Sequence, residues 1–303
     1  MGDHSEVDDA PNSTPTPAVY PFGRPGADIS LHDGPLSLDG RTCAGRIWLA
    51  TRGGLDHRWE ASFDDGHGVP LGDVLLAFDH ARLGQVTVPV QITSTAGRGV
   101  VLSSGLGPGG PLDEAVVHWV ALPSMPGTGL STPSATWAGR CALAGGGWDM
   151  TLDERPDHHL TAEAAGATPD LAVTHTGLLR CTDGATFTPR QAEDALHGWQ
   201  TVLSFALGRW VAPALAIGSR DGRAVWELWA DWRQSDWTRP HAWWDPHDRA
   251  GLDEISRLLM GAWGDPGRRD VPRTPRAGPP AREPLPSPPA CSTGRERHCW
   301  TTY

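Results

Sequence analysis

The sequence predicts an α+β protein: an antiparallel β-sandwich-like N-terminal part, then a strand-helix-hairpin-helix block, with disordered ends. Residues 46–153 alternate apolar and polar side chains, which is typical of half-buried strands. After Pro156 the pattern changes to that of two helices around a hairpin. Both ends are rich in proline and poor in large apolar residues, so they bury too little to offset the entropy of ordering.

The strands of the first part are predicted from side-chain alternation and from apolar runs bounded by glycine, aspartate and proline. Pro89 has no amide hydrogen for a ladder, so its strand is predicted to lie at an edge or to be bulged. The alternating strands are His57–Phe63, Gln85–Ile92 and Trp148–Asp153, and the more deeply buried ones are Val74–Phe78 and Ala115–Leu122.

The second part is predicted to contain a strand and a well-capped helix. The strand covers Leu171–Arg180. Thr188 can cap the following helix, Pro189 suits its first turn, and Gln191 stands where a capping box needs it. Gly208 is expected to end the helix.

A hairpin and a second helix follow in the predicted order. Leu215–Gly218 and Arg223–Trp229 are predicted to pair across a short turn. A helix is expected over about 248–263, with Leu252, Ile255, Leu259 and Trp263 on or near its apolar face.

Four regions follow from these patterns. Residues 1–40 are expected to be a disordered lead-in, 41–155 an antiparallel β domain, and 156–263 an α+β block with two helices. Residues 264–303 form a proline- and arginine-rich tail that is expected to be disordered and to be a possible frameshift product. A frameshift would expose the apolar face of the second helix and favour self-association through Leu252, Ile255, Leu259 and Trp263.

Composition excludes several classes of function. All 25 basic residues are arginines, so the chain has neither a P-loop lysine nor a lysine for a Schiff base. The net charge of −11 argues against broad nucleic-acid binding. The five cysteines are far apart, and we predict no metal and no cofactor. With no apolar run of membrane length and no signal peptide, a soluble, cytoplasmic protein is expected.

One polar cluster and one aromatic cluster are the candidate sites. His241, Asp245, His247 and Asp248 could bind a metal or act as acid and base, or instead form a helix-capping loop. A possible recognition surface consists of four tryptophans; these are Trp226, Trp229, Trp232 and Trp237.

Three further histidines are given structural roles. His158 and His159 are interpreted as part of an exposed connection between the two predicted parts. His175 lies inside a strand pattern and is interpreted as a hydrogen-bonded structural residue.

Five short motifs resemble those of an uncharacterised actinobacterial family. The motifs are Val173–Gly177, Phe187–Pro189, Leu203–Trp210, Val225–Glu227 and Trp243–Pro246. Their arrangement behind a β-rich front also resembles the N-terminal region of ApeA-type antiphage proteins, in which a helical HEPN ribonuclease domain follows. Arg190 and His197 have HEPN-like spacing but lie on the early helix, so we attribute it to chance. The resemblance thus implies a recognition region whose effector domain is missing.

Two functions of different classes remain open on the sequence. The first is a non-catalytic recognition or regulatory module, possibly of a truncated defence protein, with an unknown protein ligand. The second is a small metal- or acid/base-dependent hydrolase that uses the 241–248 cluster. No signature motif establishes an enzyme, and the non-catalytic module is preferred.

Overall fold

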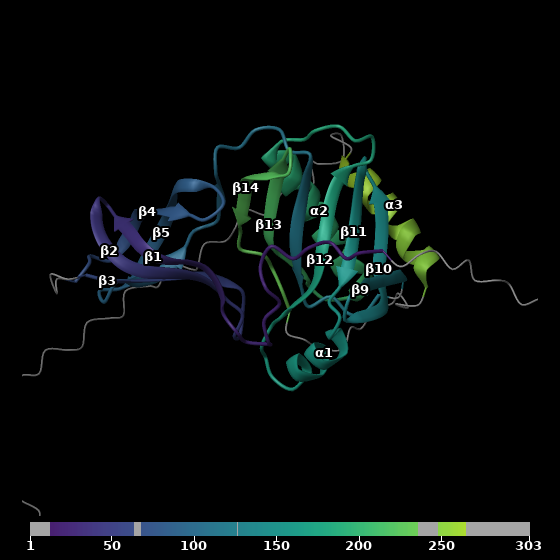
Figure 1. Cartoon of the computed structure of the whole chain (residues 1–303), viewed down its shortest axis with the longest axis horizontal. Coiled ribbons are helices and arrows are strands. Elements are labelled where there is room, and N and C mark those ends of the chain that lie inside the picture. Colours follow the sequence, from purple (N-terminus) through teal and green to yellow (C-terminus); the bar gives the residue numbers. More distant parts are fainter. Residues whose placement is uncertain (1–12, 64–67, 126, 236–247, 265–303) are drawn as a thin grey trace, which may run out of the picture. The chain divides into compact units, whose positions relative to one another are not determined.

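The computed structural model describes residues 13–63, 68–125, 127–235 and 248–264. These residues form fourteen strands and three helices, and the strands make a closed barrel and a separate sheet (Figure 1). The predicted α+β class is therefore wrong, because the described residues are mostly β and those before Ser104 form a barrel rather than half of a sandwich. Alternation identifies half-buried strands, but a sandwich and a barrel share that pattern.

Six antiparallel strands close the barrel, in the order β1-β2-β3-β6-β5-β4. Its interior is filled by side chains such as Ile47, Trp59, Leu76 and Val88, all fully buried. The strands are β1 (Ile29–Leu38), β2 (Arg41–Ala50), β3 (Asp56–Ser62), β4 (Gly72–His80), β5 (Gly84–Ser94) and β6 (Arg98–Val101).

Two details of the barrel differ from the prediction. Strand β1 falls within the expected disordered lead-in, yet it pairs with both β2 and β4 and closes the barrel. Its Asp33-Gly34-Pro35 interruption hides the apolar alternation in the sequence. Strand β5 pairs with both β4 and β6, so the predicted edge position of Pro89 is wrong, whereas the alternative of a bulged strand agrees with the register shift between Ile92 and Ser94. The β5/β6 ladder ends at Val90 and Val101, and beyond it the Leu102 amide donates to the Pro89 carbonyl, to which Pro89 can return no bond.

The other eight strands form one antiparallel sheet, in the order β7-β14-β13-β8-β12-β11-β10-β9. The expected boundary at residue 155 falls inside this sheet, between paired strands β11 and β12. The strands are β7 (Ser104–Leu106), β8 (Glu114–Val120), β9 (Thr128–Thr132), β10 (Ala135–Gly145), β11 (Trp148–Glu154), β12 (Val173–Cys181), β13 (Ala212–Arg220) and β14 (Arg223–Trp229).

Helix α2 (Pro189–Leu207) begins and ends where the sequence predicts. The Thr188 hydroxyl accepts a hydrogen bond from the Gln191 amide, and the Gln191 side chain accepts one from the Thr188 amide. Gly208 adopts a left-handed φ of 64° at the C-cap. The hairpin of β13 and β14 is also confirmed.

We expect the Thr188→Ala variant to lose about 1 kcal/mol of unfolding free energy, because it removes one half of the capping box. Thr201→Ala is a matched control. Thr201 is exposed on the same helix and its hydroxyl only donates back to the His197 carbonyl, so alanine should be neutral or slightly stabilising. Urea unfolding of both variants checks this, and equal losses would contradict it.

Helix α3 (Arg249–Gly264) packs against α2 and β10, and these two helices cover part of one face of the sheet (Figure 1). Leu252 is buried, while Ile255 and Leu259 are partly buried against the core. The Trp263 indole donates to the Asp194 carbonyl of α2, 3.0 Å away, although 37% of this residue is exposed. The apolar face that the sequence predicts to be unpartnered is thus largely covered within the described chain.

The segment between Ser13 and β1 crosses the sheet by specific hydrogen bonds. Ser13 bridges to Leu130 of β9, the Thr16 amide donates to Asp153 of β11, and the Tyr20 amide donates to His118 of β8. Residues 13–28 are therefore attached to the sheet rather than loose, which corrects the predicted lead-in. None of the helices in the described chain has the length and apolar character needed to cross a membrane.

Candidate functional site

A fully buried carboxylate, Glu227 on β14, lies where the barrel meets the sheet. Glu227 has no exposed surface, although it is charged and its neighbours Trp226 and Leu228 are apolar. On an extended strand successive side chains point to opposite faces, so Glu227 and Trp229 share the face that contacts the barrel. Burying an isolated carboxylate is costly, so its partners determine what the site does.

Both oxygens of Glu227 are held by donors. Oε1 accepts the Tyr20 hydroxyl at 2.5 Å and the Trp229 indole N–H at 2.7 Å. Oε2 accepts Arg82 Nη2 at 3.0 Å and lies 3.3 Å from His80 Nε2. Since the Arg82 amide donates to His80 Nδ1, the neutral ring carries its proton on Nε2, facing Glu227. The carboxylate is thus bound by groups from the barrel, the sheet and the N-terminal segment.

These contacts keep Glu227 ionised. Burial alone raises the pKa of Glu227, but His80, Arg82 and Tyr20 outweigh it and lower the pKa to about 2. Burial, and then the Glu227 charge, raise the pKa of Tyr20 far above its ordinary value, so its phenol stays protonated. The guanidinium of Arg82 also lies 4.4 Å from the centre of the Tyr20 ring.

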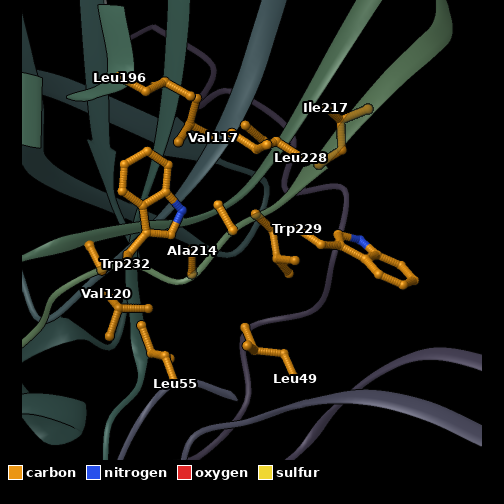
Figure 2. Packing of buried hydrophobic residues seen from close by; sticks show 14 of the residues in the cluster. Leu49, Leu55, Val117, Val120, Leu196, Ala214, Ile217, Leu228, Trp229 and Trp232 are labelled. Carbon is orange, nitrogen blue, oxygen red and sulfur yellow. The ribbon is translucent and has the colours of Figure 1, made fainter. Parts of the chain in front are cut away.

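Aromatic rings extend the same junction. Trp229 stacks on Phe78 of β4 at 5.8 Å and on His57 of β3 at 5.7 Å between ring centres. In Figure 2 the indoles of Trp229 and Trp232 point in different directions from their segment. The buried apolar residues of the barrel and of the sheet therefore form one continuous core. The charged side chain of Glu227 is buried beside this core.

His118 on β8 joins the N-terminal segment to this junction. Its Nδ1 donates to the Leu215 carbonyl at 3.3 Å, which leaves Nε2 to accept the Tyr20 amide at 3.0 Å. Burial is the main cause that lowers the pKa of His118 to about 4. The neutral ring satisfies both neighbours, whereas a protonated ring would lose the bond from Tyr20.

The junction is built for attachment rather than for chemistry. A carboxylate with a pKa near 2 is a poor proton acceptor at neutral pH, and its lone pairs are already directed at donors. With no exposed surface, its oxygens cannot meet a substrate. We call this group, Glu227 with Tyr20, His80, Arg82 and Trp229, the junction cluster.

An open groove of about 600 Å³ lies on the barrel. Arg46 and Arg98 flank Glu60 there, at 2.7 and 3.5 Å from its oxygens, and their side chains are 51% and 68% exposed. Small residues, including Ala44 and Gly45, and the ring of Phe63 also line it. Accessible charges beside apolar surface are what a binding site for another molecule requires.

The predicted polar cluster falls largely outside the described residues. His241, Asp245 and His247 lie there, so their convergence on a site stays untested. Asp248 is described, and its Oδ1 accepts the Gly251 amide at 2.9 Å in the first turn of α3. For this aspartate, the structure shows the capping geometry of the alternative interpretation.

Three of the four tryptophans predicted as a recognition surface are core residues. Trp226 and Trp232 are 4% exposed, and Trp229 is fully buried. Trp232 packs against His197 of α2, with 4.5 Å between ring centres. Trp237 lies outside the described residues. The described three thus supply packing and not an exposed aromatic platform.

The sequence contains one signal for the junction cluster. Glu227 and His118 each interrupt an otherwise apolar strand, and a lone polar residue in such a run indicates a buried, paired group. Nothing in the sequence links these residues to Tyr20, His80 or Arg82, because their proximity depends on how the barrel docks.

Comparison with known proteins finds a similarity to a family other than the one that the sequence motifs resemble. Residues 107–240, which contain strands β8 to β14, match the family described as "YopA central domain". The "SPbeta prophage-derived uncharacterized protein YopA" of Bacillus subtilis (strain 168) is 24% identical over 132 residues. This match spans 43% of the chain but only 30% of the relative.

These matches give no support to the ApeA-type resemblance, its HEPN link or an actinobacterial origin. No solved structure matches the chain. The matched residues include Glu227 and most of the eight-stranded sheet. The barrel lies outside them. In its sheet region the chain is therefore similar to the central domain of the prophage-derived protein YopA.

Proposed function

We propose that this chain is a non-catalytic recognition or regulatory module whose barrel groove binds a protein ligand. The observation that carries the proposal is the closed junction cluster. The strongly perturbed carboxylate, Glu227, is inaccessible and joins the barrel to the sheet. A sheet that holds a barrel in a defined position is suited to presenting a surface of that barrel to a partner. The groove around Arg46 and Arg98 is one accessible polar surface of the barrel.

Photo-crosslinking from the groove tests this proposal. A photoreactive residue replaces Ala96, an exposed residue that lines the groove and leaves both arginines in place, and a control replaces Leu160, which is 58% exposed on α1 (His158–Gly166). In a lysate of the source cells we expect a discrete adduct from position 96 and none from position 160. Excess wild-type protein should compete for the adduct.

The Arg46→Ala/Arg98→Ala double variant is the matched competitor. It removes two exposed ion pairs, each worth at most about 1 kcal/mol, so it should fold but fail to compete. Equal competition by this variant, or the same adducts from both positions, would rule out the groove as the binding site. Hydrolytic turnover by the purified protein that His241→Ala or His247→Ala abolishes would instead support the hydrolase hypothesis.

A further inference from the structure

A second buried polar cluster lies where β11, β12 and the start of α1 meet. Glu154 ends β11, and its register partner His175 lies on β12, so their side chains share one face of the sheet. His158 begins α1, four residues after Glu154. The ligand-type atoms of these three residues all lie within 4.8 Å of one another. The junction cluster contains none of them.

Hydrogen bonds fix the tautomer of each histidine. His158 Nε2 lies 2.9 Å from the Leu122 carbonyl, which can only accept, so this nitrogen carries the proton. The lone pair of the neutral ring is then on Nδ1, which lies 3.8 Å from Glu154 Oε1.

The same reasoning applies to His175. Thr174 Oγ1 donates to the Trp119 carbonyl and accepts the Leu122 amide, so it can only accept from His175 Nδ1, 3.1 Å away. The lone pair of His175 is therefore on Nε2, which lies 3.9 Å from Glu154 Oε2.

Two acceptor atoms of the cluster, His175 Nε2 and Glu154 Oε2, therefore face each other without a donor between them. His175 is fully buried, and neither its Nε2 nor Glu154 Oε2 makes a hydrogen bond within the described structure. The gap of 3.9 Å is too long for a hydrogen bond between them. Leaving these two atoms unpaired is costly, and a cation between them would give both a partner, with His158 Nδ1 close enough to serve as a third ligand.

We propose that Glu154, His158 and His175 bind a divalent transition-metal ion, and that this ion anchors the first turn of α1 to the sheet. Two neutral imidazoles and a carboxylate are a ligand set that zinc accepts, with water able to complete the coordination. Ligands of a tetrahedral zinc ion lie roughly 3.3 Å apart, given bonds of about 2.0 Å. The separations of 3.8 and 3.9 Å between each histidine and its nearer Glu154 oxygen exceed this by about half an ångström, and no two of the three ligand atoms are more than 4.8 Å apart.

The surroundings of Glu154 support this assignment. Its side chain is 11% exposed, so an ion can enter beside it, while the histidines are buried and held by their outer hydrogen bonds. Gly139 of β10 leaves the room that Glu154 occupies, since a Cβ there would lie 2.9 Å from the Glu154 Cβ. The Trp137 indole donates to the Glu154 carbonyl at 3.0 Å and fixes the backbone.

Zinc titration of the chelator-treated full chain is the test. We expect one zinc ion to bind per chain, and free zinc at about 100 times Kd to raise Tm by roughly 5–10 °C. Cobalt in place of zinc should give the visible absorption of a low-coordinate site with nitrogen and oxygen ligands. Both readouts are independent of any activity.

Glu154→Gln separates this proposal from simple packing. It should weaken zinc binding by on the order of 100-fold or more, because Glu154 would bind the ion directly. Losing a residue that only hydrogen-bonds a metal ligand already costs about 10–100-fold in affinity. Without metal, the same variant should melt at the same temperature as wild type or above it, because a glutamine amide can donate to His175 Nε2. Opposite effects with and without zinc are not expected of a residue that only packs.

His159→Gln is the matched control, because His159 is the exposed neighbour of His158. It should leave zinc binding and the Tm shift unchanged. If His159→Gln abolishes binding, the zinc site is a surface histidine and the proposal is wrong. Binding that leaves Tm unchanged, or that Glu154→Gln does not weaken, would also overturn it.

Discussion

The Glu227→Gln variant is expected to lose about 3–5 kcal/mol of unfolding free energy, which is the usual cost of removing the charge of one partner in a buried ion pair. Glutamine is nearly isosteric, so the loss reports charge and hydrogen bonding rather than a cavity. Its amide group would place N–H donors beside the donors from Tyr20, Trp229 or Arg82. A loss of this size is a large part of the stability of an ordinary domain.

Glu60→Gln is the matched control for that measurement. Glu60 also pairs with two arginines, but its side chain is 32% exposed on the barrel surface. Solvent screens such pairs, so its loss should stay below about 1 kcal/mol. Urea unfolding followed by tryptophan fluorescence compares the two variants. Similar losses would show that Glu227 does not hold the barrel to the sheet.

A double-mutant cycle measures how much of the lost unfolding free energy comes from the ion pair between Arg82 and Glu227. Arg82→Ala and Glu227→Gln each leave one partner without its opposite charge, so the double variant should cost less than the sum of the two. Tyr20→Phe should cost about 1–3 kcal/mol, because it takes one donor from a buried carboxylate oxygen. That result would also confirm that the segment before β1 contributes to stability.

Local sequence patterns predict several elements of this fold well. The capping box of Thr188 and Gln191, the C-cap at Gly208, and the hairpin before Trp229 are determined by residues adjacent in sequence. Their geometry depends on neighbouring backbone groups, so the sequence alone contains the information. The second predicted helix likewise corresponds to α3.

The architecture and the sites depend on contacts between distant residues, which the patterns do not contain. Closure of the barrel requires β1 to pair with β4, about forty residues later. His158 and His175 each had a plausible structural role in the sequence, and no spacing rule connects them to Glu154. Only the register of β11 on β12, with α1 beginning beside them, brings the three together.

Acidification is expected to destabilise the protein at pH values well above the pKa of Glu227. Burial lowers the pKa of both His57 and His118 to about 4, against about 6.5 for histidine in an unfolded chain. Glu227 and Asp56 act on His57 in the opposite direction, and the hydrogen bond to the Leu215 carbonyl and the charge of Glu227 do so on His118, but burial outweighs them. Both rings are therefore neutral in the folded protein at pH 7.

The direction of the effect follows from proton counts. Between pH 6.5 and 4 the unfolded chain binds protons on these rings that the folded protein does not, so the unfolding free energy falls as pH falls. From pH 7 to pH 5 each ring should cost about 2 kcal/mol. Glu227 has a folded pKa of about 2, so its contribution is lost only below about pH 4.5. The two contributions are thus separated in pH.

Urea unfolding at half-unit steps from pH 7.5 to 4.5 measures this slope. His57→Phe keeps a ring against Trp229, and His118→Gln keeps a donor and an acceptor for Leu215 and Tyr20, so both replace a titrating group by a neutral one of similar contacts. The double variant should lose more than half of the slope between pH 6.5 and 5, and His175, whose pKa burial also lowers well below its ordinary value, should keep its own share. His159→Gln, on the surface, should keep the full slope. A slope in the double variant as steep as that of the wild type would mean that other groups control acid stability. A slope that falls by more than half would show that the buried, neutral histidines around the junction cluster make the attachment of the barrel sensitive to mild acid.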